Sequence, residues 1–171
     1  ELLRALGGGH EESRDHTTGL PTVRRNPLDG TELVLIPEGE FLAGEEKHRK
    51  ILPSFYLARY PVTNAQYAEF LQANPDVKTP YRWGEENYAQ PQQPAVGMTW
   101  HEAQAYCQWA GLRLPTEWEW EKGARGTDGR EYPWGNERPD ATRTNFDRNV
   151  GHPSPVGSYP DGALSLIHIS E

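Results

Sequence analysis

The sequence is poor in several features that define common protein classes. Cys107 is the only cysteine among 171 residues, so no disulfide can form within the chain. A single unpaired cysteine favours a reducing, cytoplasmic location as the default. No apolar run approaches the ~20 residues that a membrane-spanning helix needs, so we predict no membrane association.

The chain also lacks an excess of basic residues. Lys and Arg number 17 against 25 Asp and Glu, which gives a formal net charge of −8. Because a nucleic-acid-binding surface would be basic, we predict no nucleic-acid partner. An acidic balance is ordinary in soluble proteins and indicates no particular ligand.

Aliphatic side chains are scarce as well. Hydrophobic residues make up 35% of the chain, and the mean hydropathy is −0.84. The six Trp and eight Tyr indicate a core built from a few large rings. The 17 Gly and 15 Pro predict long loops. We therefore expect an α+β domain that is loop-rich and low in regular secondary structure.

The chain begins with a segment that has no periodicity. Residues 1–30 are Gly-rich and polar, which predicts a linker or disordered tail. Two strands are predicted after it, one over the apolar run 33–36 and one within residues 51–63, each bounded by proline.

Three predicted helices begin with one pattern, a threonine followed three residues later by Gln or Glu. The threonines are Thr63, Thr99 and Thr116. In this capping box the threonine side chain accepts from the third backbone N–H, and the Gln or Glu side chain accepts from the threonine N–H. The helices are predicted to end near Ala73, Ala110 and Arg125.

The third helix lies within the stretch LRLPTEWEWEKGARG, residues 112–126. We interpret this stretch as scaffold, with Gly126 ending the helix and the tryptophans anchoring nearby loops.

No catalytic constellation is visible. Cys107 lies among small apolar residues of a helix, which is more typical of a buried small hydrophobe than of a nucleophile. The six histidines show no metal-ligand spacing. Arg113 and Arg125 are predicted to form buried structural ion pairs, and Glu121 stands at i, i+4 from Arg125. We assign no catalytic or cofactor-binding residue.

One loop is rich in oxygen ligands. The stretch NFDRN carries Asn145, Asp147 and Asn149, which could hold a hard cation such as calcium. A plain turn uses the same residue types, so both interpretations stay open on the local sequence.

Several longer motifs occur together in a fixed order. They are LVLIPEGEFLAG, FYLARYPVTNAQYAEF, QPAVGMTWHEAQAYCQWAGLRLPTEWEWEKGARG, YPWGNE, TNFDRN and SPVGSYPDGA. In combination they resemble the sulfatase-modifying-factor family, the formylglycine-generating-enzyme-like domains. The resemblance implies a fold like that of C-type lectins over residues 31–163, incomplete at its C-terminus.

The resemblance also implies an activity. The catalytic members are copper-dependent oxidases that use O₂ to convert a sulfatase cysteine to formylglycine, and two cysteines in the C-terminal part hold the copper. Thiolates suit the soft Cu(I) ion. The family's calcium ligands map onto the Asn145 side chain and the Phe146 carbonyl. A sulfatase-like peptide or another protein is the implied partner.

The sequence departs from the family pattern after Ala163. It reads LSLIHISE where the family continues with a Trp-rich block and the copper cysteines. We therefore expect a C-terminally truncated domain, a non-native tail over residues 164–171, and copper only in a complete catalytic parent. Cys107 does not match either copper ligand. Trp120 matches a tryptophan of the family, whereas Trp118 stands where the family more often has a small residue, so the resemblance implies that Trp118 is partly exposed.

Two functions are consistent with these features. In the first, the parent protein is a formylglycine-generating oxidase and the present chain is inactive. In the second, the domain is a non-catalytic, lectin-like module of a multidomain bacterial signalling protein and binds a ligand or peptide.

Overall fold

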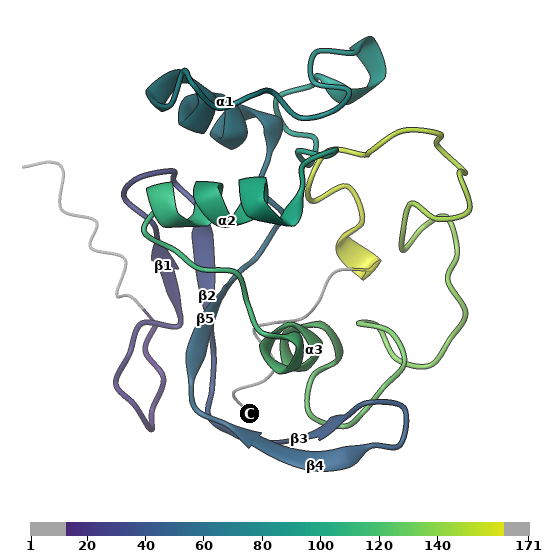
Figure 1. Ribbon diagram of the computed structural model, residues 1–171. Coiled ribbons are helices and arrows are strands. Elements are labelled where there is room, and N and C mark those ends of the chain that lie inside the picture. The colour runs from purple at the N-terminus through teal and green to yellow at the C-terminus, as the bar shows by residue number, and fades with distance from the viewer. Residues whose placement is uncertain (1–12, 163–171) are drawn as a thin grey trace, which may run out of the picture.

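The computed structural model describes residues 13–162 and confirms an α+β domain with long loops (Figure 1). Three strands form one antiparallel sheet in the order β1-β2-β5, and β3 and β4 form a separate hairpin. The strands are β1 (Val23–Arg25), β2 (Glu32–Ile36), β3 (Gly39–Ala43), β4 (His48–Leu52) and β5 (Phe55–Ala58). The expected non-native tail at 164–171 lies outside the described residues.

The three-stranded sheet is centred on β2. Its residues Leu33 to Ile36 are all buried, as an apolar run flanked by two strands should be. Val34 and Ile36 pack with Val23, Phe55 and Leu57 on one face of the sheet. The sheet therefore contributes a small aliphatic core.

The stretch predicted as one strand over residues 51–63 is divided between two sheets. β4 ends at Leu52, and β5 begins at Phe55 after Pro53. Proline cannot donate a ladder hydrogen bond, so the chain leaves one sheet there and enters the other. The hairpin strand β3 was not predicted, because Pro37 before it and Gly39 at its start indicated a turn.

The predicted linker over residues 1–30 is wrong for its later part. β1 pairs with β2 through Val23↔Val34 and Arg24↔Leu33, and Asn26 and Asp29 are buried. Polar composition alone predicted a solvated segment. These polar residues instead form an internal hydrogen-bonded turn, so they belong to the folded domain.

The three helices match their predicted bounds. They are α1 (Asn64–Ala73), α2 (Trp100–Trp109) and α3 (Glu117–Arg125), and each begins with a complete capping box. Gly111 and Gly126 follow α2 and α3 with φ near +70°. Glycine adopts this conformation without strain because it has no Cβ. Two short 3₁₀ turns, η1 (Glu86–Tyr88) and η2 (Pro160–Gly162), lie in the loops.

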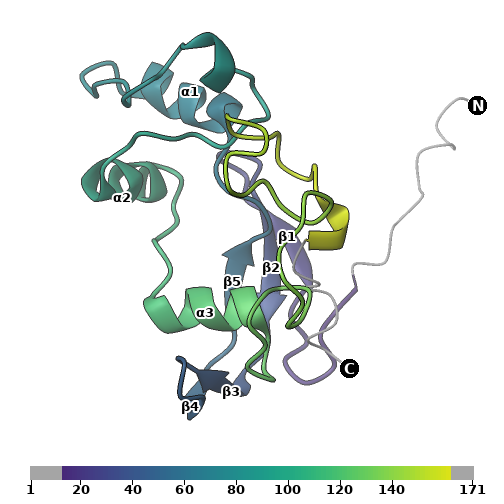
Figure 2. The ribbon, with the colours of Figure 1, turned by 90° about the vertical axis from the view of Figure 1, so that its right-hand side faces the viewer.

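An aromatic core joins α1 and α2, which lie together on one side of the sheet (Figure 2). We use this name for the buried residues Tyr67, Phe70, Tyr106 and Ala110 and the side chains packed on them. The Tyr67 ring stacks on Tyr106 with a centroid distance of 5.6 Å, and both meet Phe70 in edge-on or T-shaped contacts. A few rings thus replace the missing aliphatics.

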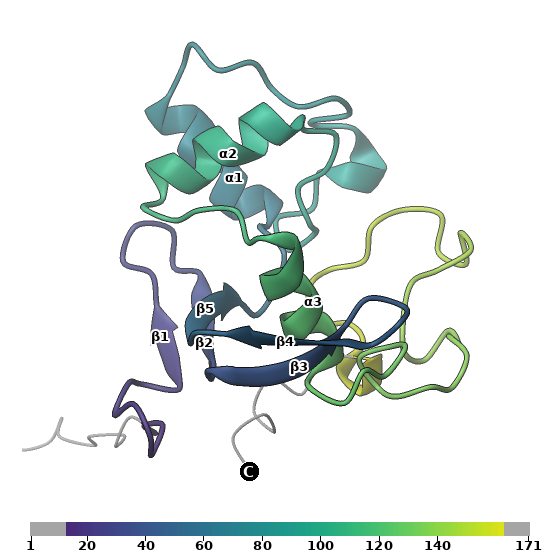
Figure 3. The same cartoon turned by 60° about the horizontal axis from the view of Figure 1, so that its bottom comes forward.

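Helix α3 packs separately, against β5 and the β3-β4 hairpin (Figure 3). Gly123 allows a close approach, since a Cβ there would stand 2.3 Å from Leu57. Lys122, in the last turn of α3, is almost fully buried. Its Nζ donates to the carbonyls of Pro37 and Gly39 and so ties α3 to the turn after β2.

Among residues 13–162 no helix is long and apolar enough to cross a membrane.

Candidate functional site: a groove along strand β5

A groove of about 1190 Å³ runs beside β5. We call it the β5 groove. Its walls are residues 54–62, the α2–α3 connection at 111–115, one face of α3 and the loop residues 131–133, with Tyr106 and Cys107 between them. Figure 2 shows the α2–α3 connection passing on the β5 side of the sheet.

The lining shows that the groove follows the edge of the strand. Successive strand residues point to opposite faces of a sheet. Every residue from 54 to 62 nevertheless lines the groove, so both faces of β5 contribute to it. Within the described residues β5 pairs only with β2, which leaves its other edge open toward the groove.

Two exposed aromatic side chains stand in the groove. Trp120 on α3 is 62% exposed and Tyr60 is 42% exposed, and both line the groove. The expectation that Trp120 anchors a loop is therefore wrong, because its position on α3 faces the groove instead of a neighbouring segment. Trp118 is partly exposed as predicted, and its ring lies 4.2 Å from Nζ of Lys50.

Both arginines form ion pairs in the groove walls, but only the Arg125 pair is largely buried as predicted, because the Arg113 side chain is 64% exposed. Arg113 binds Glu119 through both nitrogens, at 2.7 and 2.5 Å, and Arg125 binds Glu121 at 2.5 Å. The Arg113 hydrogen bond, against the opposing effect of burial, lowers the pKa of Glu119 to about 2. The Glu119 carboxylate also closes the α3 capping box, so one group ties the connection to the helix start.

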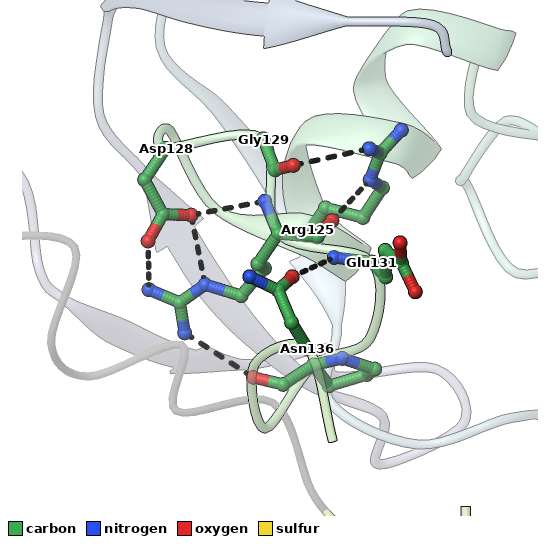
Figure 4. Close-up of polar contacts among 7 residues, drawn as sticks. Arg125, Asp128, Gly129, Glu131 and Asn136 are labelled. Atoms are coloured by element: carbon green, nitrogen blue, oxygen red, sulfur yellow. Dashed lines mark hydrogen bonds and ion pairs between the residues drawn. The ribbon is translucent and has the colours of Figure 1, made fainter. Parts of the chain in front are cut away.

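Arg125 also shapes the loop that follows α3 (Figure 4). Its guanidinium donates to the carbonyls of Arg130, at 2.6 Å, and Gly129, at 3.3 Å. Asn136 accepts from the Glu131 N–H at 2.9 Å across the same loop. These contacts hold residues 131–133 at the groove wall.

Cys107 lies half-buried between the aromatic core and the β5 groove. Burial raises the pKa of its thiol, and the nearby charge of Asp29 raises it further. A thiol held protonated is a poor nucleophile, which agrees with its interpretation as a small hydrophobe.

A buried polar cluster that the sequence did not reveal lies behind the groove. Asp29 accepts hydrogen bonds from the Tyr106 hydroxyl at 2.6 Å, from the Thr31 hydroxyl and N–H, and from Asn26. Burial acts to raise the pKa of Asp29, but these hydrogen bonds outweigh it and leave the pKa below its usual value. The stretch NPLDGT carries the turn residues that could have indicated this cluster.

Asn145 and Phe146 lie outside the β5 groove. Nδ2 of Asn145 donates to the His152 carbonyl at 2.8 Å and to Ser154 at 3.0 Å, and the Phe146 carbonyl accepts from the Asn149 N–H. Among residues 13–162 no three His, Cys, Asp or Glu side chains come together as a metal site. Residues 147–150, which follow Phe146, therefore form a turn, and the described residues bring no cluster of three acidic, Cys or His side chains to it.

Calcium at Asn145 and Phe146 stays a prediction. A bound ion would stabilise the folded state and raise the melting temperature as calcium is added. A calcium titration followed by thermal melting checks this, with magnesium as the matched control. An unchanged melting temperature at millimolar calcium would contradict the prediction.

The chain belongs to the family of sulfatase-modifying factor enzyme 1-like domains, whose model matches residues 19–170. The match confirms the family and begins before residue 31, in agreement with the position of β1. PvdO from Pseudomonas aeruginosa has a similar fold, with a TM-score of 0.65, 23% identity, and coverage of 85% of this chain and 68% of that chain.

Three curated relatives show the range of proteins that carry this domain. Hercynine oxygenase of Mycolicibacterium smegmatis is 33% identical over 85% of this chain and 44% of its own length. Serine/threonine-protein kinase Pkn1 of Chlamydia trachomatis is 36% identical over 82% of this chain and 26% of its length. Formylglycine-generating enzyme of Streptomyces coelicolor is 28% identical, over 80% of this chain and 60% of its length. The chain thus spans less than two thirds of each.

Proposed function

We propose that this domain is a recognition module that binds an extended peptide segment of another protein in the β5 groove. The observation that carries the proposal is the groove itself, which combines an open strand edge with exposed aromatic side chains. Its volume of about 1190 Å³ exceeds the roughly 300–1,000 Å³ of most small-molecule pockets, which favours a polypeptide ligand.

The chemistry of the walls supports a peptide ligand. Trp120 and Tyr60 offer large apolar surface with few rotatable bonds, as the anchors of protein interfaces do. Phe55, Leu57 and Leu114 add apolar lining between them. The ion pairs in the walls keep the groove rigid, which lowers the entropy cost of binding.

Similarity to Pkn1 favours a module within a larger protein. That relative is a kinase in which the matched region makes up 26% of the length. A domain that binds a peptide would supply such a protein with partner recognition while its catalysis takes place in other domains.

The intrinsic fluorescence of Trp120 provides a direct test. The probe is a seven-residue peptide that alternates valine and threonine and has a glutamate at each end. Binding should bury the Trp120 ring, shift its emission to shorter wavelength and saturate with peptide concentration. The Trp120→Phe variant should keep the fold and lose most of the spectral change.

A matched control uses the other tryptophan of the same helix. Trp118 packs on Lys50 away from the groove lining, so Trp118→Phe should leave the peptide-induced shift intact. An emission spectrum that the peptide does not change in the wild-type chain would overturn the proposal.

A second candidate function is oxidation of a substrate by the whole parent protein. The similarity to hercynine oxygenase and formylglycine-generating enzyme favours it. The present chain has one cysteine, which does not fit the two-cysteine copper site that the family implies. We propose that this chain alone has no oxidase activity on a cysteine-containing sulfatase peptide with copper and O₂, and detection of the aldehyde product would refute that.

A further inference from the structure

We draw no further inference here: the strongest candidate, the surface patch of exposed aromatic side chains made by Tyr81 in the loop before η1 and Trp100 at the start of α2, has no feature among residues 13–162 that shows what would cover it.

Discussion

The aromatic core and the β5 groove are built from similar side chains but differ in what covers them. In the aromatic core Tyr67, Phe70 and Tyr106 pack on one another and are almost fully buried. In the β5 groove Tyr60 and Trp120 remain 42% and 62% exposed. Aromatic side chains thus stabilise the fold where a second helix packs on them, and they line a groove where no second helix covers them.

The polar groups of the two regions differ in the same way. Next to the aromatic core, where Tyr106 also reaches the groove, the Asp29 carboxylate accepts hydrogen bonds from the side chains of three residues. At the β5 groove the backbone groups of Tyr56 and Ala58 have no backbone hydrogen-bond partner among residues 13–162. Satisfied buried polar groups specify a fold, whereas unpaired strand edges invite a partner.

The largest expected effect comes from truncating a ring in the aromatic core. Phe70→Ala should lower the free energy of unfolding by about 3–5 kcal/mol, because it opens a cavity against the rings of Tyr67 and Tyr106. Trp120→Ala in the groove is the matched control, with an expected loss under about 1 kcal/mol. Urea denaturation of both variants measures the difference, and equal losses would remove the distinction between the two regions.

The second-largest expected effect comes from removing the buried carboxylate of Asp29. Asp29→Ala should cost about 1–3 kcal/mol, since it leaves the hydroxyl of Tyr106 and the groups of Thr31 without their acceptor. Asp76, an exposed residue, provides the control Asp76→Ala, which should change stability little. A thermal melt of Asp29→Ala that matches the control would contradict a structural role for the cluster.

The ion pair at the groove wall predicts a pH dependence. The pKa of Glu119 is about 2 in the folded chain, below its ordinary value of 4.5. A depressed carboxyl pKa stabilises the fold above pH 4.5, and this contribution is lost as the pH falls from about 4.5 toward 2. Because the Arg113 side chain is 64% exposed and screened, we expect a loss of about 1–2 kcal/mol.

Glu119→Gln isolates this contribution from other acidic groups. The variant should be less stable than the wild-type chain at pH 7, and the difference should shrink toward pH 2. Unfolding free energies measured across this range check the sign. A difference that grows with acidity would mean that the ion pair does not lower the pKa.

The smallest expected effect concerns one hydroxyl in the aromatic core. The Tyr67 hydroxyl is buried and has no hydrogen-bond partner among the described residues. Tyr67→Phe should therefore leave stability unchanged or raise it by up to about 1 kcal/mol. Tyr106→Phe removes a hydroxyl that donates to Asp29 and should lower stability instead, so differential scanning calorimetry of the pair distinguishes the two sites.

Local features of the fold were predictable from short stretches of sequence. Thr63, Thr99 and Thr116 begin helices because each cap depends on residues within four positions. The Glu121–Arg125 pair follows from one turn of helix for the same reason. β1 and the β3-β4 hairpin were not predictable in this way, because a short strand is defined by the partner with which it pairs.

The sequence by itself determined the family, the three helices and their ends, and a core made of rings, because caps, turns and composition act over a few residues. Only the tertiary structure decided which rings are buried and which line the β5 groove. Contacts such as Tyr106 with Asp29, 77 residues apart, and Lys122 with Pro37, 85 residues apart, arise when distant segments meet. The open edge of β5 is likewise a property of the assembled sheet, since a strand's free side exists only once its other side is paired.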